Sequence, residues 1–221
     1  TDIIWDIIKV GLPASLSMIV MAVGQGVFNK ILVHISVNTV AAYQVAGRLD
    51  MLVFLPIFSI AASLTTLVGM FYGAKEYGAL RYIIKYGIFS ALLITIISST
   101  IVYTFAGHVV RFFTDDASIV IIAVNFLQIF AFAYPFISVG ITTGRVLQGL
   151  GKGLPVLIIT IVRVLGVSAP LALFFVFIMD KTVEWVWYSM MLSTIVAFGI
   201  GLTWLISTLK TLPTSGQSLN N

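Results

Sequence analysis

The segment from residue 41 to 76 carries the charges with the most chemical meaning. It is long and apolar, yet it holds Arg48 and Asp50 near one end and Pro56 in its interior. A helix over residues 40–72 would be about 50 Å long, whereas the hydrocarbon core of a bilayer is about 30 Å thick. Arg48 would then lie just inside one membrane boundary, where a charge costs up to about 3 kcal/mol. Because Arg48 and Asp50 are two positions apart, they point to different faces of the helix and each needs another partner or water.

Two interpretations of this pair stay open. In the first, Arg48 extends to the lipid headgroups and Asp50 lies at the membrane interface. In the second, one or both face a water-filled cavity between helices. A third intramembrane charge, Arg163, lies about ten residues into a later apolar span, near its middle, where an arginine is hard to accommodate. It either lines the same kind of cavity or makes a structural bond to backbone carbonyls or to the region of Gln148.

Motifs typical of enzymes are missing. His34 and His108 fall at expected loop positions without a paired nucleophile. The glycine-rich segment 149–153 lacks the preceding strand and the trailing Ser or Thr of a phosphate-binding loop. The sequence therefore predicts a protein that is not an enzyme and needs no cofactor.

No metal site is expected either. The chain has no cysteine, so a thiolate site is impossible. Asp115 and Asp116 are adjacent carboxylates in a turn, where such residues usually cap a helix and interact with its dipole. We expect Thr114 or Asp115 to be the N-cap of the helix that follows.

The composition predicts a polytopic membrane protein. Of the 221 residues, 60% are hydrophobic and 9% are charged, which no water-soluble globule can accommodate without a greasy exterior. We therefore expect an all-α membrane protein with six transmembrane helices and no nucleic-acid partner. An interfacial lead-in is expected over residues 1–9 and a disordered polar tail over residues 211–221. The expected spans are about 10–33, 40–72, 86–106, 119–150, 154–179 and 183–209.

Several spans carry polar or helix-bending residues at regular spacing. Gln25 and Asn29 lie on one face of the first span, which should face inward because lipid cannot satisfy amide groups. Equally, Gln25 could bond across to a neighbouring helix. Gly140 and Gly144, in the fourth span, have the spacing that permits another helix to approach closely. Three prolines should bend helices and act as hinges, namely Pro56, Pro135 and Pro170.

The basic residues predict an orientation. Those on one side of the membrane are Lys9, Lys75, Arg81, Lys85, Arg145, Lys152 and Lys210, and those on the other are Lys30, Arg111 and Lys181. Because cytoplasmic loops carry an excess of Lys and Arg, both termini are expected in the cytoplasm, with the chain crossing the inner membrane.

Four segments resemble the multidrug and toxic compound extrusion (MATE) transporters. They are GLPASLSMIV at 11–20, VAAYQVAGRLDMLVFLPIFSIAASLTTLVGMFYGAKEYG at 40–78, GRVLQGLGKGLP at 144–155, and the spacing from Arg163 to Pro170. They occur in the family's order and spacing. The resemblance is strongest to the DinF-like branch, and it extends over nearly the whole of residues 10–210.

The resemblance implies one six-helix lobe, the C-terminal one, of a twelve-helix, two-lobe transporter. Members export cationic or amphiphilic toxic compounds by alternating access, driven by H⁺ or Na⁺ influx. The partners implied are the lipid bilayer, an N-terminal lobe of the same polypeptide and small organic substrates. The face expected to line the cavity carries Gln25, Asn29, Gln44, Arg48, Asn125 and Gln128.

The coupling ion is expected to bind mainly in the N-terminal lobe. Some family members carry acidic ligands in the first and fourth helices of the C-terminal lobe, whereas both corresponding spans lack Asp and Glu in this sequence. In the DinF-like branch, an arginine at the position of Arg48 lies in the cavity and the coupling aspartates belong to the other lobe. A start at Thr1 without Met leads us to expect that a further lobe precedes this one.

Two other functions fit parts of the pattern. A lipid-linked oligosaccharide flippase of the same superfamily is favoured by the intramembrane arginines Arg48 and Arg163, which could hold a pyrophosphate. The other function is that of a non-transporting six-helix scaffold or of a half-transporter that forms homodimers.

Overall fold

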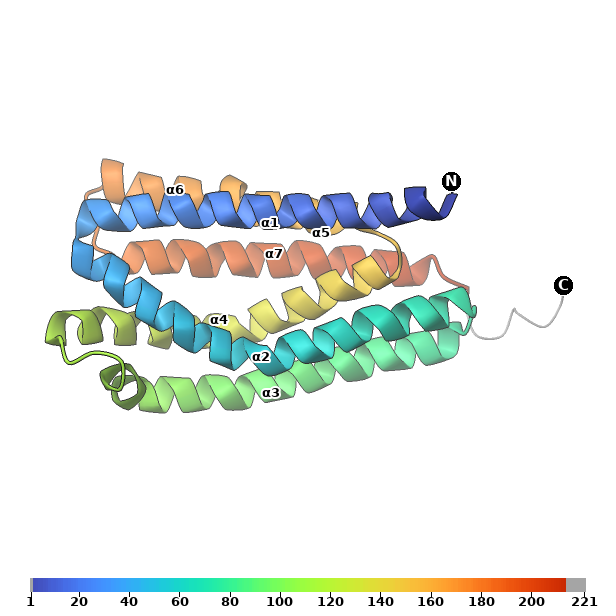
Figure 1. Ribbon diagram of the computed structural model, residues 1–221, viewed down its shortest axis with the longest axis horizontal. Coiled ribbons are helices and arrows are strands. Elements are labelled where there is room, and N and C mark those ends of the chain that lie inside the picture. The colour runs from blue at the N-terminus through green and yellow to red at the C-terminus, as the bar shows by residue number, and fades with distance from the viewer. Residues whose placement is uncertain (1, 214–221) are drawn as a thin grey trace, which may run out of the picture.

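The computed structural model describes residues 2–213 and shows six long helical rods lying side by side (Figure 1). Four rods are single helices, namely α1 (Asp2–Ile35), α2 (Val37–Gly73), α3 (Tyr77–Arg111) and α4 (Ala117–Gly149). The fifth consists of α5 (Leu154–Ile161), η1 (Val162–Ser168), α6 (Ala169–Leu173) and η2 (Phe174–Ile178), and the sixth is α7 (Glu184–Lys210). Each rod is long and apolar enough to cross a membrane, and the described residues include no strand. The predicted all-α fold with six spans is confirmed.

Several helices extend beyond the apolar spans that the sequence marks. Residues 2–9, expected as an interfacial lead-in, are helical and continuous with α1. In the same way α3 begins at Tyr77 rather than near residue 86. Polar residues at a membrane surface can continue a helix, so hydropathy finds the membrane-depth part and not the helix ends. Of the predicted disordered tail, residues 211–213 form a turn and residues 214–221 lie outside the described residues.

Two turns differ from the sequence-based expectation. Between α1 and α2 only Ser36 is non-helical, and its side chain accepts a hydrogen bond from the Thr39 amide at 3.1 Å. The N-cap of α4 is Asp116, not Thr114 or Asp115, because Asp116 has the extended backbone that a cap requires. Its carboxylate accepts hydrogen bonds from the Ser118 hydroxyl and amide, and these bonds lower the pKa of Asp116.

The helix α4 lies at the centre of the lobe. It packs against α2, α3 and α7, and it contributes many of the fully buried side chains. One buried cluster contains the aromatic residues Phe126, Tyr134 and Trp187, and a second contains Leu64, Leu147 and Leu205 among others. The cavity described below lies beside the aromatic cluster.

The three predicted hinge prolines lie inside helices. Pro56 lies near the middle of α2 and Pro135 near the middle of α4, and both helices change direction part-way along their length (Figure 1). Each proline removes one backbone hydrogen bond and pushes its ring against the preceding turn, which bends a helix. Pro170 lies in α6, a short α-helical piece between the π-helical turns of η1 and η2. Motion at these prolines stays a prediction.

The tight backbone approach of α4 to α2 occurs at Gly149 rather than at Gly140. A Cβ atom added to Gly149 would lie 2.7 Å from the Thr65 carbonyl oxygen, whereas a Cβ on Gly140 would meet nothing within 4 Å. Within the described residues no other helix lies close to Gly140, whereas a Cβ on Gly144 would lie 3.7 Å from Val156 Cγ1 of α5, an ordinary van der Waals contact.

Replacing Gly149 with alanine should destabilise the lobe. The new methyl group would meet a backbone oxygen that cannot rotate away, and such overpacking costs about 1–3 kcal/mol. Gly140→Ala is the matched control, since it adds the same methyl to the same helix in open space. Thermal unfolding in detergent should show a lower midpoint for Gly149→Ala alone; equal midpoints for the two variants would contradict this packing.

Candidate functional site

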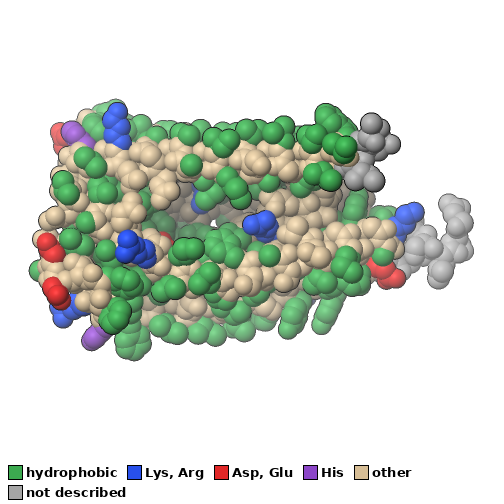
Figure 2. Space-filling view, viewed as in Figure 1, with side chains coloured by type: hydrophobic (Ala, Val, Ile, Leu, Met, Phe, Trp, Pro, Cys, Tyr) green, Lys and Arg blue, Asp and Glu red, His purple; other side chains and the backbone are tan. Residues whose placement is uncertain are grey.

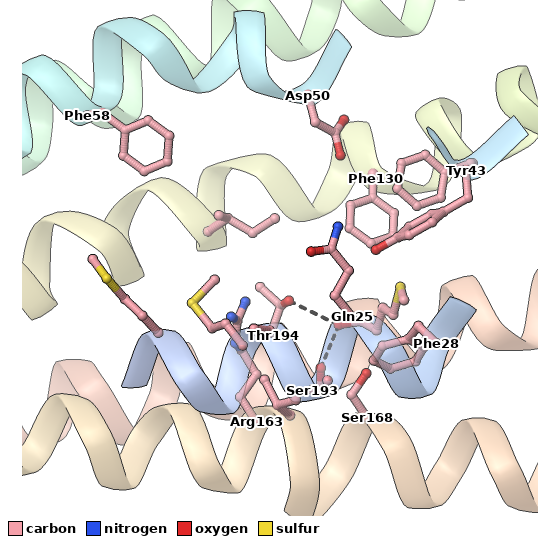
Figure 3. Close-up of a pocket in the computed structure, with 18 of the residues that line it drawn as sticks. Gln25, Phe28, Tyr43, Asp50, Phe58, Phe130, Arg163, Ser168, Ser193 and Thr194 are labelled. Atoms are coloured by element: carbon pink, nitrogen blue, oxygen red, sulfur yellow. Dashed lines mark hydrogen bonds between the residues drawn. The ribbon is translucent and has the colours of Figure 1, made fainter. Parts of the chain in front are cut away.

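A cavity of about 670 Å³ lies among α1, α2, α4, η1 and α7. Figure 2 shows the surface hollowed in this region, and Figure 3 shows the residues that face the hollow. Its volume lies within the range of about 300–1,000 Å³ typical of small-molecule sites. Much of the wall is apolar and consists of flexible methionine or aromatic phenylalanine side chains. They are Met18, Met21, Phe28, Phe126, Phe130 and Met190. Such a wall can accept ligands of many shapes.

One acidic and two basic side chains interrupt this apolar wall. They are Asp50 from α2, Arg145 from α4 and Arg163 from η1. Arg145 donates a hydrogen bond of 3.4 Å to the side chain of Gln148. Arg163 is half-buried, and no residue in the described part of the chain forms a hydrogen bond or an ion pair with its guanidinium.

Asp50 is held in place by Tyr134. The buried Tyr134 hydroxyl donates a hydrogen bond to one carboxylate oxygen of Asp50. The Tyr134 ring packs edge-to-face against Phe54, with centroids 5.3 Å apart, and Phe54 lies one helical turn after Asp50 on α2. The hydroxyl is therefore fixed against the α2 face that carries Asp50. The second carboxylate oxygen is left for a ligand.

Arg163 lies in a π-helical stretch of the fifth rod. A π-helical turn contains an extra residue, so it rotates the side chains that follow relative to an α-helix, and such turns are frequent at functional sites. The neighbouring Val164 packs so tightly on α1 that a Cβ added to Gly24 would lie 2.2 Å from Val164 Cγ1. Gln25, the next residue on α1, lines the cavity together with Arg163. The glycine thus lets α1 approach η1 and brings both polar side chains to one cavity.

The amide residues predicted to line a cavity from α1 and α2 have two different environments. Gln25 lines the cavity of this lobe. Asn29 and Gln44 pair with each other, the Gln44 amide donating to Asn29 Oδ1 at 3.3 Å. The cross-helix bond that the sequence allowed for Gln25 is therefore made by its neighbour Asn29, which links α1 to α2.

The remaining predicted residues do not line this cavity. Arg48 and Gln128 are exposed on α2 and α4. Asn125 has a buried amide oxygen without a hydrogen-bond partner among the described residues. The structural bond that the sequence allowed between Arg163 and Gln148 is also not made, because Gln148 pairs with Arg145. Lining of a cleft between two lobes by Arg48, Gln128 and Asn125 stays a prediction.

Sequence reasoning missed three polar residues that shape the site. Tyr43 lines the cavity together with Asp50 and Arg163, and Tyr134 and Arg145 complete the set. A tyrosine at membrane depth directly before Pro135 was an available signal, because a buried phenol needs a polar partner.

Comparison with known proteins decides the family. The sequence profile of the MatE family matches residues 13–174. The chain belongs to the MatE family. It is 28% identical over 167 residues to the probable multidrug resistance protein NorM of Thermotoga maritima, covering 76% of this chain and 36% of that protein. It is also 28% identical over 152 residues to the multidrug export protein MepA of Staphylococcus aureus (strain NCTC 8325), covering 69% and 34%.

Solved MATE structures share the fold of this lobe. A MATE transporter in its straight conformation matches with a TM-score of 0.89 and 29% identity over 96% of this chain and 48% of that chain. The chain thus spans about half of that structure and about a third of the curated relatives. It is a multi-pass membrane protein of a transporter family, and its membership in the DinF-like branch stays a prediction.

Proposed function

We propose that this MatE chain is the C-terminal lobe of a secondary antiporter that exports organic cations and amphiphilic toxic compounds by alternating access. The main support for this proposal is the cavity, because it combines an apolar wall of Met and Phe side chains with the Asp50 carboxylate at membrane depth. The names of the relatives, multidrug resistance and multidrug export proteins, support the substrate class.

Asp50 is the proposed contact for a positively charged substrate. Tyr134 occupies one of its carboxylate oxygens and leaves the other toward the cavity. Aromatic rings from Tyr43, Phe126 and Phe130 line the same space and can attract a cation through their faces. A lipophilic cation would therefore exchange water for a carboxylate and aromatic rings inside a low-dielectric site.

The coupling ion, H⁺ or Na⁺, is proposed to bind mainly in an N-terminal lobe. Among the described residues there is no group of three His, Asp or Glu side chains that could hold a metal ion. Sodium at membrane depth prefers several hard oxygen ligands, usually including carboxylates. Asp50 alone, with one oxygen already occupied, is a poor site for it.

The lobe is proposed to lie in the cell's inner membrane with both termini in the cytoplasm. The first helix begins and the last helix ends on the same side of the bundle, where the α2–α3 and α4–α5 turns also lie (Figure 1). Lys75 and Lys152 lie in these two turns, and Lys9 and Lys210 lie near the two chain ends of the bundle. This excess of positive charge supports a cytoplasmic side. An N-terminal lobe would add its own bundle to form the cleft that opens alternately.

Reconstitution tests the proposal directly. Purified full-length transporter in liposomes loaded with a cationic dye should release the dye when an inward H⁺ or Na⁺ gradient is imposed. An ionophore that dissipates the gradient should stop this release. Dye release at the same rate with and without either gradient would rule out antiport.

A further inference from the structure

The structure also indicates a second polar contact in the proposed substrate cavity. We propose that Arg163 binds an acidic group, a carboxylate or a phosphate, of an amphiphile whose apolar part fills the cavity. The proposal rests on the proposed function only in using the same cavity, and its test measures binding rather than transport.

The unpartnered guanidinium of Arg163 is the first observation. Arg163 faces the cavity, and within the described residues it makes no hydrogen bond and no ion pair. A guanidinium has five N–H donors in a planar fork that matches a carboxylate or a phosphate. A half-buried charge without a partner has lost part of its hydration, so a ligand that supplies two acceptor oxygens gains affinity there.

The wall around Arg163 lacks an acidic side chain that could neutralise it. Among the described residues, Asp50 is the one carboxylate that lines the cavity, and it lies on the opposite wall, engaged by Tyr134 (Figure 3). Ser193 and Thr194 line the same cavity, but both hydroxyls donate to the Met190 carbonyl, at 2.8 and 3.0 Å. The guanidinium therefore keeps its donors for a ligand.

The charge balance of the cavity also favours a ligand with an acidic group. Within the described part of the chain, two guanidiniums, Arg145 and Arg163, and one carboxylate, Asp50, line it, so with all three ionised these residues carry one excess positive charge. A cationic ligand can pair with Asp50 but leaves the guanidinium of Arg163 unpaired, whereas an acidic group would pair with Arg163. A zwitterionic amphiphile fits best, with its cationic group toward Asp50 and its acidic group toward Arg163.

Binding of two matched fluorescent probes tests the inference. Pyrenebutyrate and pyrenebutanol share one apolar ring system and differ in the carboxylate. Full-length transporter in phosphatidylcholine nanodiscs should bind pyrenebutyrate about tenfold or more tightly than pyrenebutanol, since a hydrogen bond to a charged group contributes that much. In Arg163→Gln the preference should disappear while pyrenebutanol affinity is retained, and Arg163→Lys should restore part of it.

A matched control separates this contact from general charge effects. Arg111→Gln removes an exposed guanidinium at the end of α3, a helix that contributes no residue to the cavity wall, and should keep the full preference. An unchanged preference in Arg163→Gln would overturn the proposal.

A measurement on the unaltered protein does not depend on the folding of a variant. Phenylglyoxal labels arginine side chains, and mass spectrometry reports the labelling of each one. Pyrenebutyrate should protect Arg163 and leave Arg111 labelled, whereas pyrenebutanol should protect neither. Absence of protection at Arg163 would contradict the inference.

Changing the nanodisc lipid distinguishes the two possible sources of the acidic group, a lipid headgroup and a solute. If an anionic lipid headgroup is the natural occupant, phosphatidylglycerol in the nanodisc should compete with pyrenebutyrate in the unaltered protein and fail to compete in Arg163→Gln. If the occupant is a solute, phosphatidylglycerol should leave pyrenebutyrate binding unchanged. Loss of dye transport together with retained probe preference would count against the antiporter proposal and not against this subsite.

Discussion

Asp50→Asn is expected to reduce efflux of a cationic dye by about tenfold or more. The substitution removes the one carboxylate that the described residues contribute to the cavity lining, and a charge-assisted contact in such a site contributes about 1.5–3 kcal/mol. The shape of the side chain and its bond from the Tyr134 hydroxyl can both be kept, because an asparagine oxygen also accepts. The measurement is dye efflux from proteoliposomes that contain the full-length variant.

The control for this variant is Asp115→Asn. Asp115 lies exposed in the α3–α4 turn and does not line the cavity, so its replacement should leave efflux at the unaltered rate. Efflux of an uncharged dye should also be less affected in Asp50→Asn than efflux of the cation. Equal loss for both dyes would mean that Asp50 supports the fold rather than recognises charge.

Trp187→Ala is expected to lower the free energy of unfolding by about 3–5 kcal/mol. Trp187 is fully buried and joins α7 to its neighbours, with its ring stacked on Tyr43 at 5.8 Å and edge-to-face against Phe126 at 4.9 Å. Alanine would leave a large void where three helices meet. Chemical unfolding in mixed micelles, followed by circular dichroism, measures the change.

Trp5→Ala is the matched control for that prediction. Trp5 is 58% exposed on α1, so its removal should change the unfolding free energy by no more than about 0.5 kcal/mol. Trp187→Phe keeps a ring between Tyr43 and Phe126 and removes an indole N–H that has no partner in the described part of the chain. The loss of unfolding free energy in Trp187→Phe should fall between the losses in the two alanine variants. A loss for Trp187→Ala as small as that for Trp5→Ala would refute the central packing role.

The helical framework could be predicted because one physical signal dominates it. A membrane span must be apolar and hydrogen-bonded within itself, so hydropathy alone locates all six rods. The cap of α4 was placed wrongly, because Thr114, Asp115 and Asp116 all have capping side chains and only the backbone conformation selects Asp116. The close contact at Gly149 depends on where α2 crosses α4, which small-residue spacing does not determine.

The site was only partly predictable, since it depends on the rotation of each helix. Arg48 and Asp50 point to different faces of α2, so one face toward the cavity of this lobe accommodates one of them. Packing of α2 on α4 turns Asp50 inward and leaves Arg48 exposed. Arg163 lies in the π-helical turns of η1, which change the helical phase. No residue pattern in the sequence predicts such turns.

Locating a bound cation shows whether the lobe binds substrate in this cavity. A structure of the full-length transporter with a bromophenyl-triphenylphosphonium cation would show the bromine by its anomalous signal. We predict this signal inside the cavity, among Tyr43, Phe126 and Met190, with the phosphonium on the Asp50 side. A bromine signal at another place in the transporter, with this cavity empty, would contradict the claim that the lobe binds substrate here.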